Sequence, residues 1–213
     1  MADIFTEVDR DLRADRAERL WKRYGWLVIA AAIVIVAATA GYVGWREWQR
    51  RASVAAGDQF QVAVSQALRG DAATAGATAA SLATTAPAGY AMLARLAEAN
   101  WLAEQGKTAE AIQRYDAAAA AADDPTFREL AALASVQLRF ESDPPAELLQ
   151  RLAPLAAPTG RYRFTALELQ GLAHVKAGNA AAAKQSFQAL ADDLAAPAGA
   201  RARAAELLQA LGG

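Results

Sequence analysis

The sequence has no cysteine and only one histidine among its 213 residues. The lack of thiols excludes a disulfide framework, a cysteine nucleophile and closed zinc sites built from cysteine and histidine. An excess of charge of one sign is also missing, because 22 lysines and arginines face 23 aspartates and glutamates. A near-neutral chain lacks the basic surface that binds phosphate backbones, so we expect no nucleic-acid partner.

Catalytic motifs are missing as well. The sequence contains no phosphate-binding glycine loop, nucleophile elbow or zinc-protease helix. His174 lies within a helical pattern without nearby partners for metal binding or proton transfer, so we interpret it as a packing residue. The acidic doublets Asp123-Asp124 and Asp192-Asp193 end helical segments, where exposed acids need no catalytic explanation. We therefore expect no enzymatic activity, no cofactor, no metal and no small-molecule substrate.

The most abundant residue is alanine, with sixty copies in the chain. Alanine has the highest helix propensity, and β-branched residues are sparse outside one segment. The composition therefore predicts an all-α protein.

One long apolar run stands near the N-terminus. No charged residue occurs from Tyr24 to Trp45, and the 20 residues from Trp26 to Trp45 span about 30 Å as a helix. Aromatic residues stand at both ends of the run, as they do at membrane interfaces. A buried core helix is the alternative, but such helices are usually shorter or carry a polar stripe. The run predicts a transmembrane helix over residues 24–45.

The distribution of positive charge predicts the orientation of this helix. Six lysines and arginines precede the run, and Arg46, Arg50 and Arg51 follow it. This asymmetry favours an N-terminus on the cytoplasmic side. Cleavage at the A-x-A-like site of residues 38–40 stays open, although the run is longer than the 7 to 15 residues of a signal peptide's apolar region. Gly41 and Gly44 form a small-residue notch suited to packing against another membrane helix, unless they reflect ordinary glycine usage in membrane spans.

Residues 3–23 read as a short helix that continues into the membrane run. Its apolar residues Ile4, Val8 and Leu12 share one face. Its charged residues form pairs four positions apart, which favours a solvated helix without a specific partner. The pairs are Asp15 with Arg19 and Glu18 with Lys22.

The remaining residues, 46–213, repeat with a period of 36. Gly70, Gly106 and Gly178 each separate two helical segments and lie 36 and 72 residues apart, and Ser142 occupies the missing position. Breaks at 87–89, 123–125, 158–160 and 197–199 alternate with these turns. The spacing predicts about four hairpins of helices about 14 residues long, stacked into a short right-handed α-solenoid. A helix over 198–211 would cap it with Leu207, Leu208 and Leu211.

The hairpins resemble tetratricopeptide repeats. With Gly178 at repeat position 15, small or aromatic residues fall at positions 8, 20, 24 and 27, namely Gly171, Ala183, Phe187 and Leu190. The same register around Gly106 gives Ala99, Ala111, Tyr115 and Ala118. This second repeat departs from the pattern, because Arg95 and Glu98 take positions that are usually tryptophan and leucine.

Solenoids commonly bind partners on their concave surface, to which the first helix of each hairpin contributes. Asn100 is the sharpest candidate, because an amide can hydrogen-bond a bound peptide backbone, although it also reads as an ordinary exposed residue. No lysine cluster indicates a ligand defined by its terminal carboxylate. The candidate groove residues are Leu93, Leu96, Asn100, Glu104, Glu168, Leu172 and Lys176.

The whole chain resembles the YfgM-like ancillary subunits of the bacterial SecYEG translocon. The segments that carry the resemblance are Gly44-Trp45-Arg46-Glu47-Trp48, Gln59-Phe60, residues 90–96, residues 168–171 and residues 176–179. The resemblance implies an inner-membrane, single-pass protein with a periplasmic repeat domain. It also implies SecYEG, a PpiD-like membrane-anchored chaperone and exported proteins as partners. An envelope scaffold or assembly factor for a cell-wall or outer-membrane machine remains the alternative.

Overall fold

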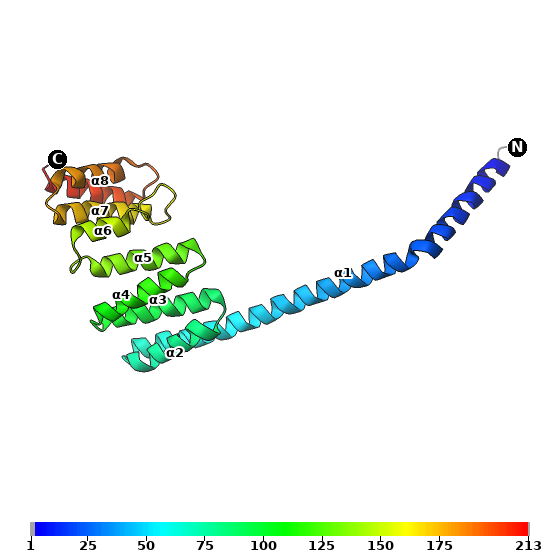
Figure 1. Ribbon diagram of the computed structural model, residues 1–213, viewed down its shortest axis with the longest axis horizontal. Coiled ribbons are helices and arrows are strands. Elements are labelled where there is room, and N and C mark those ends of the chain that lie inside the picture. Colours follow the sequence, from blue (N-terminus) through cyan, green and yellow to red (C-terminus); the bar gives the residue numbers. More distant parts are fainter. Residues whose placement is uncertain (1–2, 213) are drawn as a thin grey trace. The chain divides into compact units, whose positions relative to one another are not determined.

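The computed structural model describes the backbone of residues 3–212 and the side chains of residues 21–27 and 29–212. Within these residues the chain forms nine helices and no strand, which confirms the all-α prediction (Figure 1). The helices divide into two compact units, one up to Ala52 and one from Ser53 onward.

The first unit is part of helix α1, Asp3–Leu68, which is 66 residues long. Among the described helices, α1 is the one that is long and apolar enough to cross a membrane. Its apolar side chains are exposed, with 67% of Trp26, 63% of Ile33 and 68% of Val36 accessible. A core helix of a soluble protein would bury these side chains, so their exposure favours a lipid environment.

The N-terminal part of α1 agrees in its backbone with the expected continuous helix. The apolar face of Ile4, Val8 and Leu12 lies outside the described side chains. The ion pairs of Asp15 with Arg19 and Glu18 with Lys22 likewise depend on side chains outside that set. They stay predictions.

The second unit contains the end of α1 and eight further helices, each packed against the next along the chain. Figure 1 shows them following one another from cyan to red. In the first hairpin, Ala56 and Phe60 of α1 pack with Ala79 and Leu82. The helices are α2 (Ala72–Thr85), α3 (Ala88–Glu104), α4 (Thr108–Ala121), α5 (Pro125–Arg139), α6 (Pro145–Leu152), α7 (Arg163–Lys176), α8 (Ala180–Asp192) and α9 (Ala198–Ala210).

Three of the four predicted turns share one geometry. Gly70, Gly106 and Gly178 have φ angles of +84°, +75° and +72°. In each turn, the amide that follows the glycine donates a hydrogen bond of 2.9 or 3.0 Å to the carbonyl five residues earlier. Glycine is favoured here because a side chain in the left-handed region meets steric strain.

The fourth turn falls at the predicted place but is built differently. No residue other than glycine has a positive φ angle in the described chain, so Ser142 does not reproduce the glycine turn. The amides of Ser142 and Asp143 instead both donate to the carbonyl of Arg139, at 3.1 and 2.9 Å. The 36-residue spacing is therefore kept while the turn geometry changes.

The helix after this turn is shorter than predicted. Helix α6 has 8 residues, where the repeat pattern gave about 14. Pro154 follows two residues after its end, and proline lacks the N–H group and clashes with the preceding turn of a helix. The chain continues irregularly to Tyr162, and Leu155 in this stretch is buried against the core.

The repeat signature positions form the core of their hairpins. All eight of them are buried, with Ala99, Ala111, Tyr115 and Ala118 in the second hairpin and Gly171, Ala183, Phe187 and Leu190 in the fourth. The C-terminal helix α9 packs Leu207, Leu208 and Leu211 against the same cluster as Phe187. The predicted capping role of this helix is confirmed by these contacts.

Candidate protein-interaction surface

On α3, the predicted groove residues differ in accessibility. Leu93 is 39% exposed, whereas Leu96 is half-buried against the cluster that contains Met92 and Tyr115. The amide of Asn100 donates a hydrogen bond of 2.8 Å to the carboxylate of Glu104, one helical turn away. Both residues are exposed. Leu93, Asn100 and Glu104 therefore form the accessible part of the predicted set on this helix.

On α7, the predicted groove residues make contacts with neighbouring hairpins. Glu168 accepts two hydrogen bonds from the guanidinium of Arg203 on α9, at 2.9 and 2.8 Å. Lys176 donates to the carbonyls of Phe140, Glu141 and Asp143 at the end of α5, at 2.5, 3.2 and 3.0 Å. Leu172 is half-buried in the core of the last hairpins. Glu168 and Lys176 connect neighbouring hairpins, which leaves fewer of their polar groups for a partner.

A network of hydrogen bonds and ion pairs, which we call the polar joint, holds α4 against α5. The Ser135 hydroxyl, 1% exposed, donates to Asp116, and the Arg139 guanidinium bonds to Asp116 at 2.6 Å and to Asp143 at 3.3 Å. Burial alone raises the pKa of Asp143, but hydrogen bonds from Ser142 and Arg139 outweigh it and hold the pKa below its ordinary value. Every member of the joint has a partner, so it has a structural role.

Three of the four acids in the doublets have structural partners, and one of them is Asp192, which accepts a hydrogen bond of 2.7 Å from the side-chain amide of Gln188. Asp124 caps α5 by accepting from the Thr126 amide at 2.7 Å, and this bond lowers its pKa. Asp193 pairs with Arg163 at 2.6 Å. Within the described residues, no three histidine, cysteine, aspartate or glutamate side chains gather in a way that could hold a metal ion.

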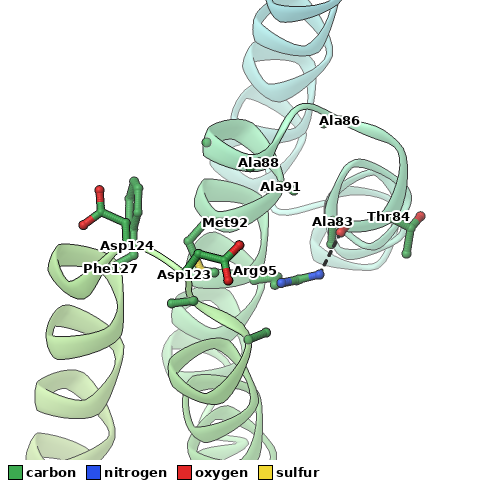
Figure 2. A pocket seen from close by; sticks show the side chains of 13 residues that line it. Ala83, Thr84, Ala86, Ala88, Ala91, Met92, Arg95, Asp123, Asp124 and Phe127 are labelled. Atoms are coloured by element: carbon green, nitrogen blue, oxygen red, sulfur yellow. Dashed lines mark hydrogen bonds between the residues drawn. The ribbon is translucent and has the colours of Figure 1, made fainter.

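A hollow opens between α2 and α4, above α3 (Figure 2). Its volume is about 610 Å³, and six of the thirteen residues that line it are alanines. The guanidinium of Arg95 donates a hydrogen bond of 3.1 Å to the carbonyl of Ala83 across it. A second hollow of about 450 Å³ shares Ala83, Thr84, Arg95 and Ala121 with the first. Glu98 and Arg114 line this second hollow and form an ion pair at 3.3 Å.

These hollows lie on the side of α3 roughly opposite the predicted groove. At 3.6 residues per turn, Arg95 points about 200° away from Leu93 around the helix axis. In the sequence, Arg95 and Glu98 stand out only as departures from the repeat pattern. Charged residues at positions that are usually tryptophan and leucine were the available signal for this surface. The alanines that line the hollows gave no signal in the sequence, because alanine is abundant throughout the chain.

Comparison with known families identifies the architecture. Residues 18–211 match the tetratricopeptide repeat-like domain family. A search of curated proteins and a search of solved structures each found no match. The match covers most of the chain and agrees with the stacked hairpins, the glycine turns and the buried signature positions. Domains of this kind mediate protein–protein interactions. The chain therefore belongs to the tetratricopeptide repeat-like domain family.

Proposed function

We propose that this protein is an ancillary subunit of the SecYEG translocon. It is a membrane-tethered periplasmic interaction module that assists the export of proteins and their hand-over to a PpiD-like membrane-anchored chaperone. In this proposal residues 1–23 are cytoplasmic, residues 24–45 span the inner membrane, and residues 46–213 form the periplasmic domain. It has no catalytic role.

The observation that carries the proposal is the succession of two features in one chain. An exposed apolar helix, long enough to cross a membrane, leads into a tetratricopeptide repeat-like domain. A domain of this kind, held at a membrane, concentrates its binding surface where exported chains emerge. The resemblance to YfgM-like subunits supplies the identity of the machine.

Two surfaces are available to partners in this proposal. In the domain, Leu93, Asn100 and Glu104 present one apolar and two polar side chains on α3. In the membrane helix, Gly41 and Gly44 leave open space, because a Cβ atom added at either would meet nothing within 4 Å. Small residues in a membrane helix let a second helix approach closely.

The experiment is purification of the full chain from native membranes in mild detergent through a C-terminal tag, followed by mass spectrometry. We expect translocon subunits and a membrane-anchored prolyl isomerase to copurify. Recovery of cell-wall or outer-membrane assembly proteins in their place would reject the export function in favour of an envelope scaffold.

A variant pair tests the membrane contact. Gly41→Leu with Gly44→Leu should reduce recovery of the translocon subunits, because the added side chains fill the notch. Ala32→Leu is the control, since it adds a leucine side chain on the other side of the same helix. Equal recovery from both variants would exclude packing through the glycines.

A further inference from the structure

The two hollows beside α3 adjoin at the four residues that they share, and together we call them the alanine trench. Its floor is the face of α3 from Ala88 to Glu98, and its walls are the facing sides of α2 and α4. Ala80, Ala117 and Ala121 on these walls are exposed, so they line the trench without supporting the core. The trench lies entirely within the solenoid.

The dimensions of the trench suit a short piece of polypeptide. The eleven residues of α3 from Ala88 to Glu98 are joined by ten rises of about 1.5 Å, so this face extends about 15 Å. An extended chain rises about 3.3 Å per residue, so four or five residues would fill this length. The larger hollow alone, at about 610 Å³, has the volume of an ordinary ligand pocket. The alanine side chains of the lining present methyl groups, against which the apolar side chains of such a segment can lie.

Two polar groups border the trench with bonding capacity to spare. Arg95 carries five N–H donors, and its one hydrogen bond within the described part of the chain is to the Ala83 carbonyl. Asp123 lies at the mouth, and Figure 2 shows its carboxylate on the side of Arg95. Among the described side chains, this carboxylate has no hydrogen-bond or ion-pair partner.

The neighbours of Asp123 leave its carboxylate available. Asp124 also lines the hollow, but its carboxylate caps α5 by accepting from the Thr126 amide. Arg128 donates to the backbone carbonyls of Ala122 and Asp123. Its guanidinium therefore bonds to carbonyl groups after the end of α4 and not to the carboxylate of Asp123. The other charged pair in the trench, Glu98 with Arg114, is already compensated.

We infer that the alanine trench binds an extended segment of a protein partner, four or five residues long, that carries small apolar side chains and one lysine or arginine. The cationic side chain pairs with Asp123, a backbone carbonyl of the segment accepts from Arg95, and the small side chains lie against the alanine walls. This inference does not depend on the translocon, since it follows from the trench alone.

The test uses the full chain in detergent micelles and a fluorescein-labelled pentapeptide of sequence Ala-Val-Ala-Lys-Ala, capped at both ends. A second pentapeptide has glutamate in place of lysine. Binding is measured by fluorescence anisotropy. We expect the lysine peptide to bind about fivefold more tightly than the glutamate peptide, which corresponds to one accessible ion pair.

Variants locate the binding on the protein. Asp123→Asn should remove the preference for lysine, and Asp58→Asn, another exposed carboxylate of the solenoid, should keep it. Ala121→Phe fills the trench and should weaken binding of the lysine peptide by about tenfold or more. Ala120→Phe is its matched control, because this exposed neighbour on α4 does not line the trench. Circular dichroism of each variant checks that it is folded.

Three results would overturn the inference. These are the absence of measurable binding by the wild-type protein, equal binding of the two peptides, and unchanged binding by Ala121→Phe. If Ala121→Phe leaves peptide binding unchanged but converts a dimer into a monomer in sedimentation, a second copy of the chain occupies the trench. Loss of the translocon from the copurification experiment would leave these peptide results unaffected, so the two proposals fail separately.

Discussion

Adding one methyl group at Gly171 should destabilise the solenoid, although alanine is the better helix former. Gly171 lies in α7 directly against the ring of Phe187 on α8, which is 0% exposed. A Cβ atom at this position would lie 2.6 Å from Cζ and 2.7 Å from Cδ1 of the ring. Contacts this short force two packed helices apart, because the buried ring has no free space to enter.

The magnitude follows from two opposing effects. Overpacking a core costs about 1–3 kcal/mol, whereas replacing glycine by alanine within a helix gains up to about 1 kcal/mol. We expect Gly171→Ala to lose about 1 to 2 kcal/mol of the free energy of unfolding. For a domain of this size that lowers the melting temperature by about 2 to 8 °C.

The assay is thermal unfolding of the full chain in detergent, followed by far-ultraviolet circular dichroism. Gly76→Ala is the matched control, because a Cβ atom at this position in α2 meets nothing within 4 Å. It should raise the melting temperature through helix propensity alone. The two glycine-to-alanine changes are thus expected to shift the melting temperature in opposite directions.

A double variant isolates the contact. Combining Gly171→Ala with Phe187→Leu should cost about 1 kcal/mol less than the sum of the single changes, since the smaller side chain makes room for the methyl group. If Gly171→Ala melts at or above the melting temperature of the wild type, then Gly171 of α7 and Phe187 of α8 are not in close contact and the reasoning is refuted.

Three further predictions use the same unfolding assay or urea denaturation. Gly178→Ala should destabilise by about 1 kcal/mol because its φ angle is +72°, whereas Ser142→Gly should give no gain because Ser142 is not left-handed; a gain would contradict the two turn geometries. The lowered pKa of Asp143 means that its carboxylate stabilises the fold above the ordinary pKa of 3.8, and that this contribution is lost as pH falls through the folded-state value. Asp143→Asn should therefore have a lower urea midpoint than the wild type at neutral pH, and the two midpoints should converge in acid. A difference between the midpoints that stays constant with pH would refute this. Lys176→Met should lower the melting temperature through loss of three hydrogen bonds to carbonyls, and an unchanged value would mean that Lys176 is free for a partner.

Local features of the chain were readable from the sequence. The turn glycines could be located because their left-handed conformation excludes most other residues, and the repeat period carried that information along the chain. The long apolar helix was readable because no charged residue interrupts the run from Tyr24 to Trp45. The buried positions Tyr115 and Phe187 followed from the repeat register. The length of α6 was the exception, because Pro154 ends this helix earlier than the repeat period predicts.

The location of the candidate binding surface could not be predicted from the sequence, because neighbouring hairpins cover some faces of each helix and leave others open. Glu168 and Lys176 looked like groove residues on α7, but Arg203 and the carbonyls at the end of α5, at least 33 residues away, meet them in the structure. The alanine trench arises because small side chains on α2 and α4 face each other across α3. The sequence by itself therefore determined the helices, including the long apolar one, and their turns, since these follow from local periodicity and conformation. Only the tertiary structure decided which polar groups are already paired and where a hollow stays open, since both depend on residues far apart in the chain.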